Sequence, residues 1–168
     1  PDDNGFTQQV GDQRSQGIEL ETAFDLPRGV KGVFVYAYTD SELTRFSEFI
    51  IVSQDPFIGV NFDRSGNSSA FAPEHLARLW LSKRFGRGLQ VAGGVRFVDD
   101  QFIAEDNVST IDSHALVDAA LSYTVGNWRL RLQLENLTDE EYATRGFGSS
   151  SMIPGNPTAA YFGIERRF

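Results

Sequence analysis

The sequence contains no cysteine, and this absence excludes disulfide frameworks, thiol catalysis and thiolate metal sites. Basic residues are also scarce, because 15 lysines and arginines stand against 23 acidic residues and give a net charge of -8. A nucleic-acid partner is therefore not expected, since phosphate binding needs a basic surface. With two histidines in the chain, His75 and His114 at separate strand starts, no catalytic triad or metal site can be assembled, so the protein is not expected to be an enzyme.

Long apolar runs are missing as well. Charged residues interrupt every apolar stretch well short of the ~18 residues that a transmembrane helix requires. A membrane-spanning β-strand instead carries its signal in alternation, which an average hydropathy does not reveal. The 16 glycines, 14 phenylalanines and 5 tyrosines, beside a single methionine, favour β structure over helix.

Alternation of apolar and polar residues predicts an all-β, antiparallel fold of about seven strands. The clearest strand runs from Trp128 to Glu135, where four apolar residues alternate with Arg129, Arg131, Gln133 and Glu135. The segment from Val30 to Thr39 is apolar on both faces, so its orientation stays open. The predicted strands cover residues 18–24, 30–39, 74–85, 89–97, 117–123, 128–135 and 158–168.

The connections between these strands alternate in length. Short turns follow Leu26, Phe85 and Val125, whereas long loops are expected over residues 40–71, 99–113 and 138–157. Outer-membrane barrels show this asymmetry, with tight periplasmic turns and long extracellular loops. A soluble sheet with one solvated face would share the alternation of single strands, but it gives no reason for the asymmetry.

Aromatic residues support the same prediction. Five of them lie close to a short turn or at residue 168, on the apolar face of their strands. This is the distribution expected of a ring of aromatic side chains at a membrane interface. Lys83 is the exception on that face, and its position near Phe85 would let its ammonium group reach the interface. The sequence thus predicts a segment of a transmembrane β-barrel. The five aromatic residues are Phe24, Phe85, Tyr123, Trp128 and Phe168.

Motifs in the last third of the chain resemble those of a known family. Residues 136–142, with Asn136, Leu137, Asp139 and Tyr142, are similar to the Asn-Leu-x-Asp-x-x-Tyr signature of TonB-dependent outer-membrane receptors. Residues 161–168 resemble their closing strand, which ends in a phenylalanine, here Phe168, that the barrel assembly machinery reads. Residues 13–20, 72–75 and 93–97 are similar to strands of the ferric-siderophore branch. Residues 155–158 depart from the family, because Thr158 stands where many relatives carry arginine.

The resemblance implies the rest of the architecture and the function. TonB-dependent receptors have a barrel of ~22 strands with a plugged lumen. Residues 1–168 are then expected to form the carboxy-terminal portion of such a barrel, with the plug domain, the TonB box and the earlier strands outside this sequence. The implied function is TonB-coupled import of ferric siderophores across the bacterial outer membrane. The iron would arrive as a chelate, so no cofactor and no protein metal site are expected.

Ligand contacts in this family lie on extracellular loops and use aromatic and basic side chains. Two loops of this chain offer such residues, for which simple loop packing is the competing explanation. Three other functions stay open: a small self-contained barrel with a structural or adhesion role, a soluble β-sandwich binding module, and uptake of another nutrient such as cobalamin or haem. The candidate ligand-binding residues are Phe57, Phe62, Arg64, Tyr142, Arg145 and Phe147.

Overall fold

The structure, a computed structural model, describes residues 11–147 and 151–168. Short elements complete the fold at the two ends of its strands: the 3-10 turn η1 (Pro27–Gly29), the pair β6 (Gln101–Phe102) and β7 (Thr110–Ile111), and the pair β10 (Ala143–Phe147) and β11 (Ser151–Pro154). Among the described residues, the structure contains no helix with the length and apolar character of a membrane span. The main strands are β1 (Gly11–Leu26), β2 (Val30–Gln54), β3 (Phe57–Asp63), β4 (His75–Phe85), β5 (Leu89–Val98), β8 (His114–Val125), β9 (Trp128–Glu135) and β12 (Ala159–Arg166).

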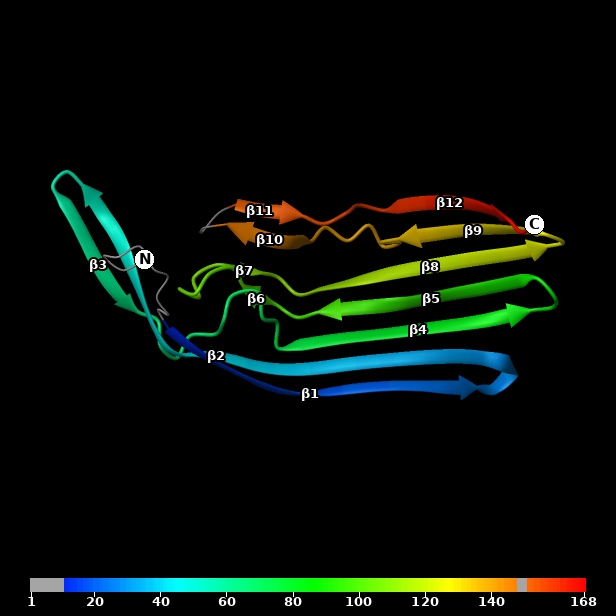
Figure 1. Cartoon of the computed structure of the whole chain (residues 1–168), viewed down its shortest axis with the longest axis horizontal. Helices are drawn as coiled ribbons and strands as arrows, with labels where there is room; N and C mark the ends of the chain where they lie inside the picture. The colour runs from blue at the N-terminus through cyan, green and yellow to red at the C-terminus, as the bar shows by residue number, and fades with distance from the viewer. Residues whose placement is uncertain (1–10, 148–150) are drawn as a thin grey trace.

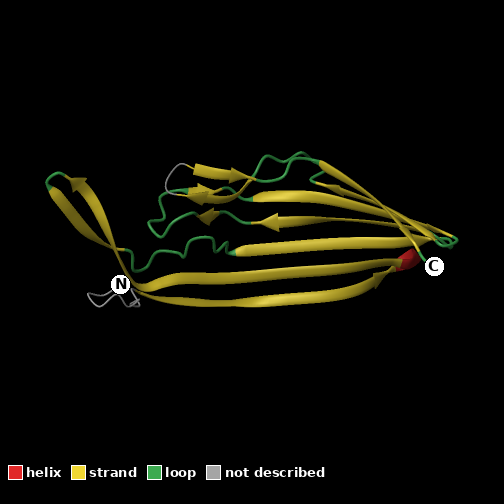
Figure 2. Cartoon of the chain, turned by 45° about the horizontal axis from the view of Figure 1, so that its top comes forward, coloured by secondary structure: helices red, strands yellow, loops and turns green. Residues whose placement is uncertain are grey.

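The main strands form one antiparallel sheet (Figure 1). Seven of its eight strands follow the order β1-β2-β4-β5-β8-β9-β12, while β3 pairs with β2. Each of these seven strands therefore lies beside the next of the seven in the sequence, which is the connectivity of an up-and-down barrel wall. Seen obliquely, the sheet is curved rather than flat (Figure 2). The prediction of an all-β antiparallel fold is confirmed, and each of the seven predicted strands lies on one strand of this order.

The register places the apolar residues of all seven strands on one face. Leu121 of β8 lies opposite both Val91 of β5 and Leu132 of β9, and Leu132 lies opposite Phe162 of β12. These side chains stay accessible, since Phe162 is 67 % exposed and Ile164 is 59 % exposed. Soluble monomers rarely present such an extended apolar surface. The face is suited to contact with lipid.

The register also settles the orientation of the strand whose two faces are both apolar. On β2, Phe34 lies opposite Leu79 of β4, and Tyr36 lies opposite both Leu20 of β1 and Ala77 of β4. The even-numbered residues from Val30 to Tyr38 therefore belong to the apolar face. The odd-numbered residues of this segment face the other way, where the neighbouring strands carry their polar side chains.

The short turns and the long connections lie at opposite ends of the sheet. The turns β4–β5 and β8–β9, together with η1, lie at the same end as the carboxy terminus (Figures 1 and 2). Phe85, Tyr123 and Trp128 are at this end and are 45 %, 44 % and 46 % exposed. Partly exposed aromatic side chains at the ends of strands are typical of a membrane interface. The predicted asymmetry of turns and loops is confirmed.

Lys83 shows how a cation is accommodated on the apolar face. Its ammonium nitrogen lies 4.9 Å from the centre of the Phe85 ring, on the side of the short turns. Arg166 behaves similarly, with its guanidinium carbon 5.2 Å from the centre of the Trp128 ring and 5.0 Å from that of Phe168. Both side chains thus place their charge among the aromatic rings at the end of the strands, where cation–π contact and water are available.

One predicted loop is wrong. Residues 40–71 do not form a loop throughout, because β2 continues to Gln54 and forms a hairpin with β3. The scattered Ser, Asn, Gly and Pro residues indicated a loop, but alternating β-branched and aromatic residues prefer extended structure and pair across the two strands. Phe49 and Val60, for example, lie on opposite arms of this hairpin, which bends away from the sheet (Figure 1). The other two predicted loops contain the short pairs β6–β7 and β10–β11.

Candidate functional site

The best-buried apolar residues lie at the loop end of the sheet rather than within it. Leu43 is 5 % exposed, Ile103 4 %, Ile111 2 % and Leu116 2 %. Leu43 and Leu116 belong to strands, on the face opposite the lipid-suited one, whereas Ile103 and Ile111 come from the β5–β8 connection. Burial of apolar surface is the main stabilising contribution available to such loops. The loop end therefore has a small core of its own, which holds the rim in a defined shape.

Two neighbouring connections are joined by a reciprocal pair of hydrogen bonds. The Asn107 side chain accepts a bond from the backbone nitrogen of Ser68 (2.8 Å) and donates one to the carbonyl of the same residue (2.9 Å). In return, Asn67 donates to the carbonyl of Glu105 (2.7 Å). A side-chain amide that bonds to both the N–H and the carbonyl of one residue holds the two loops in a fixed relative position. We call this contact the interloop clamp.

Asn107→Ala is expected to loosen the interloop clamp. The change removes both bonds between partly buried groups and places alanine at a positive φ of 54°, so it should lower the local stability by about 1–3 kcal/mol. Hydrogen exchange at the amide of Ser68 should become roughly tenfold faster or more, since ~1.4 kcal/mol corresponds to a factor of ten. Val108→Ala is the matched control, because Val108 is 73 % exposed and adjacent. Equal exchange rates at Ser68 in both variants would contradict the clamp.

The segment that resembles the family signature, residues 136–142, forms a second junction at the end of β9. Asn136 is 3 % exposed, and its amide nitrogen donates to the carbonyls of Glu140 and Asn156, both at 3.0 Å. Its amide oxygen accepts a hydrogen bond from the backbone nitrogen of Glu140 at 2.9 Å. The backbone nitrogen of Asn136 donates to Asp118 of β8 at 3.0 Å. One side chain thereby connects the end of β9 to both parts of the connection that leads to β12.

Thr158 completes this junction. Its hydroxyl donates to the carbonyl of Asn136 at 2.7 Å, and its backbone nitrogen donates to the carboxylate of Asp139 at 3.2 Å. Asn136 and Asp139 both have a positive φ (49° and 52°), which these two residue types tolerate better than most. Asn136 and Asp139 of the signature are therefore explained as structural residues that close the last connection.

Tyr142 packs beneath the β10–β11 pair. Its ring stacks on His114 with 4.6 Å between the ring centres. Its backbone carbonyl accepts a hydrogen bond from the backbone nitrogen of Gly155 at 2.7 Å. A Cβ at position 155 would lie 2.1 Å from the Tyr142 ring, so any larger residue there would have to displace this ring. Leu137, in contrast, donates its backbone nitrogen to Val117 (2.8 Å) and keeps a side chain that is 43 % exposed.

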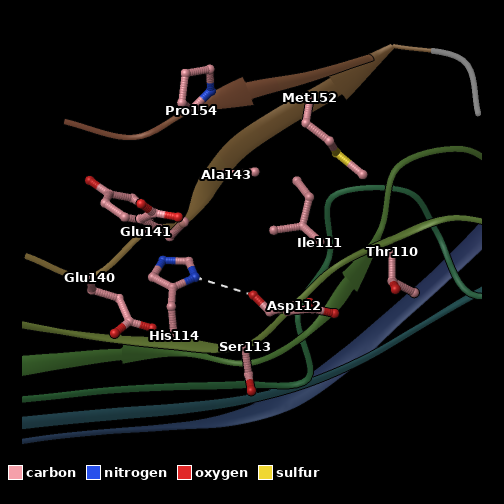
Figure 3. Close-up of a pocket in the computed structure, with 11 residues that line it drawn as sticks. Thr110, Ile111, Asp112, Ser113, His114, Glu140, Glu141, Ala143, Met152 and Pro154 are labelled. Carbon is pink, nitrogen blue, oxygen red and sulfur yellow. Dashed lines mark hydrogen bonds between the residues drawn. The ribbon is translucent and has the colours of Figure 1, made fainter. Parts of the chain in front are cut away.

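Tyr142 and His114 belong to the wall of a cavity of about 530 Å³ at the loop end (Figure 3). His114 stands in its wall, and a ring nitrogen lies 3.3 Å from the carbonyl of Asp112. The cavity is mixed in character, since apolar Ile111, Met152 and Pro154 share it with three carboxylates. Within the described residues, no cluster of His and acidic side chains could hold a metal ion. The lining residues are Thr110, Ile111, Asp112, Ser113, His114, Glu140, Glu141, Tyr142, Ala143, Met152 and Pro154.

A second cavity of about 300 Å³ lies next to it, on the polar face of the sheet. Tyr142 contributes to both cavities, so they meet at its ring. Here Arg78 and Arg96 lie opposite each other on β4 and β5, and Asp118 and Glu135 supply acidic groups. Charges of both signs and amides of this kind suit a wet interior surface. The polar lining consists of Arg78, Arg96, Asp118, Gln133, Glu135, Asn136, Tyr142 and Asn156.

The candidate ligand residues of the first loop lie on the β2–β3 hairpin. Phe57 is 66 % exposed and Phe62 is 38 % exposed. Arg64 is held by Glu48, with bonds of 3.2 and 3.1 Å, and lies 5.1 Å from the centre of the Phe62 ring. Nearby, the side-chain and backbone hydrogen bonds from Ser65 lower the pKa of Asp63. Arg64 thus has a packing role in the structure, and its contact with a ligand stays a prediction.

The candidates of the last loop are divided between two environments. Tyr142 lines both cavities, whereas Arg145 and Phe147 lie on β10, with Phe147 64 % exposed. The β2–β3 hairpin extends from a strand near one edge of the main sheet, whereas β10–β11 is a separate pair in the connection to β12, the strand at the other edge, so the structure does not bring the two sets of candidates together (Figure 1). His114, Asp112 and Asn107 were not among the predicted residues, because their role depends on loop contacts that alternation does not reveal.

Comparisons with known proteins agree with this geometry. A family model described as "TonB dependent receptor-like, beta-barrel" matches residues 1–137. The ferrioxamine receptor of Yersinia enterocolitica is 24 % identical over 164 residues, which are 94 % of this chain and 20 % of that receptor. The ferrichrome outer membrane transporter/phage receptor of Escherichia coli is 26 % identical over 176 residues, 99 % of this chain and 20 % of that protein.

Solved structures give the same result. The crystal structure of the siderophore receptor PiuA from Acinetobacter baumannii superposes with a TM-score of 0.79 and 26 % identity, over 92 % of this chain and 22 % of that one. The chain therefore spans about a fifth of the length of the curated relatives it matches. The two-faced sheet, the turn and loop asymmetry and the family match lead to one conclusion. The chain belongs to the TonB-dependent receptor-like β-barrel family of the bacterial outer membrane.

Proposed function

We propose that this chain supplies wall and rim to an outer-membrane transporter that binds ferric siderophores and imports them with TonB-coupled energy. The observation that carries the proposal is the two-faced sheet whose polar face ends in a packed, cavity-bearing loop rim. Relatives over nearly the whole chain are described as ferrioxamine and ferrichrome receptors, which supports a ferric chelate as the cargo.

Each part of the segment has a place in this function. The apolar face would contact outer-membrane lipid, and the polar face would line the lumen. The rim cavities, which meet at Tyr142, would form part of the vestibule that receives the chelate. No chemical step is proposed for the segment, because the protein is proposed to be a transporter and not an enzyme. The iron would enter already held by its chelator, so the protein would need no cofactor.

Two protein partners are proposed with it. Phe168 would be read by the barrel assembly machinery during insertion, and it is fully accessible to such a partner. Contact with the TonB complex would be made by another part of the receptor. Energy would then reach this segment through the lumen rather than through its strands.

Uptake of radioactive iron tests the proposal directly. Cells that lack their own siderophore receptors would express the receptor that contains this segment and would be offered ferrichrome or ferrioxamine labelled with radioactive iron. Accumulation of one chelate is expected in cells with TonB and not in cells without it, as active transport requires. Haem and cobalamin are the matched alternatives. Uptake of either of these in place of every ferric chelate, with the receptor correctly inserted, would contradict the proposal.

A further inference from the structure

The cavity of about 530 Å³ at the loop end combines hydrogen-bond acceptors with an apolar wall. Asp112, Glu140 and Glu141 line it, and none of its described lining residues is a lysine or an arginine. In Figure 3 both glutamates lie on the same side of the cavity as His114, and Ile111 lies on the other side. The volume is in the range of small-molecule sites. We call this cavity the acidic rim cavity.

The carboxylates of the acidic rim cavity are not neutralised within residues 11–147 and 151–168. None of the three forms an ion pair there. An adjoining cavity of about 360 Å³ shares Glu140 and Glu141, and its described lining also has no lysine or arginine. The connection between β5 and β8, residues 99–113, contains five acids and no base. Because a cleft lined by charge of one sign concentrates ligands of the opposite sign, this rim favours a cation.

His114 gives a second and independent indication of the ligand. The residue is 9 % exposed, and its Nδ1 atom lies 3.3 Å from the carbonyl of Asp112. A carbonyl only accepts, so in this contact Nδ1 carries the hydrogen and Nε2 is an acceptor. Nε2 has no hydrogen-bond partner within the described residues, and in Figure 3 it points away from Asp112, to the side of Glu141. An acceptor that opens from a buried side chain into a cavity suits a ligand that donates.

A protonated primary amine meets both requirements. It is a cation with several N–H donors and no acceptor, so it can bond to carboxylates and to Nε2 of His114 at the same time. The alkyl arm that carries the amine can cover Ile111 and Met152, and the charge can lie against the ring of Tyr142. An anion would instead meet charge of its own sign.

We propose that the acidic rim cavity binds the protonated amine of a cationic ferric chelate, and so selects such chelates over neutral and anionic ones. A ferric ion held by three hydroxamates is neutral, and a free amine arm makes that chelate a cation, whereas a ferric tris-catecholate is an anion. This inference rests on the proposed function, because it names the charge class of the cargo. Binding is electrostatic and involves no covalent step.

Two matched chelates test this selection in the receptor purified from outer membranes. Ferrioxamine B carries a free amine, and acetylation of that amine removes the charge without changing the iron centre. Equilibrium binding should be about fivefold tighter for the amine form, the upper range for one exposed ion pair. The ratio should fall as salt is added, because mobile ions screen exposed charges.

The double variant Glu140→Gln with Glu141→Gln should bring this ratio close to one and leave binding of the acetylated chelate unchanged. The fold should be kept, since the bonds between Asn136 and Glu140 use the backbone groups of Glu140. Asp100→Asn is the matched control. It removes the same kind of charge from the same rim, but Asp100 lines neither of the two acidic cavities, so the ratio should stay that of the wild type.

Equal binding of the two forms to the wild type, or a ratio that persists in the double variant, would overturn this inference and leave the proposed function standing. Failure of both forms to bind the folded receptor would overturn it as well. The proposed function would then stand if a ferric tris-catecholate bound instead, and it would fall if the receptor bound haem or cobalamin alone.

Discussion

Leu132→Arg is expected to prevent stable insertion of the barrel. Leu132 lies between Leu121 and Phe162 on the apolar face, within the part of the strands enclosed by lipid. A charged residue on the lipid face near the bilayer midplane costs on the order of 2–4 kcal/mol. The amount of receptor in outer membranes and its unfolding by denaturant in lipid vesicles should both report this loss.

Gln133→Arg is the matched control for Leu132→Arg. The two positions are adjacent on β9, but Gln133 lines the polar cavity that also contains Glu135 and Asp118. A charge there remains in a wet, partly acidic environment, so the free energy of unfolding should change little. If both variants lost the same stability, or if Leu132→Arg were harmless, the assignment of the apolar face to lipid would be wrong.

Asn136→Ala is the second change with a large expected effect. It removes three side-chain hydrogen bonds at a position that is 3 % exposed, and it leaves the carbonyls of Glu140 and Asn156 without that donor. The free energy of unfolding should fall by on the order of 3 kcal/mol. Thermal unfolding in detergent measures the loss, and hydrogen exchange over residues 137–158 should show where the structure opens.

Two further variants separate the causes of this loss. Asn136→Gly also removes the hydrogen bonds, but glycine accepts the positive φ of 49° at this position, so it should be less damaging than alanine. Asn156→Ala is the control, because the junction uses the backbone carbonyl of Asn156. A stability of Asn136→Ala equal to that of Asn156→Ala would show that the junction is not a stabilising element.

The main sheet could be predicted from the sequence because its signal is local. In a strand, neighbouring side chains point to opposite faces, so lipid on one side and a polar lumen on the other force alternation at every step. Trp128–Glu135 shows this most clearly, and there the predicted and observed strands coincide. On β2 the local pattern fails, because Val33 and Val35 make the polar face apolar as well. There the partners Leu79 and Ala77 on β4 were needed to assign the faces.

The rim could not be predicted in the same way, because its contacts join residues far apart in the sequence. The clamp between Asn107 and Ser68 spans 39 positions, and an asparagine in a polar loop carries no sign of its partner. The β2–β3 hairpin was missed for a related reason, since Ser47 and Asn61 suggested a loop although they lie in paired strands. The role of Tyr142 was predicted as ligand contact, and the structure adds the packing against His114 that positions it.

The separation of tight turns from long connections has a consequence for how the protein can change over time. Gly126 and Asn127 alone link β8 to β9, and Gly126 has a positive φ of 55°, so an inserted residue would have to replace this tight turn by a different turn type. At the opposite end, an added or deleted stretch near Val108 would alter the outline of the mouth without disturbing the wall. Changes in length are therefore expected to be tolerated better at the end of the long connections than at the end of the short turns.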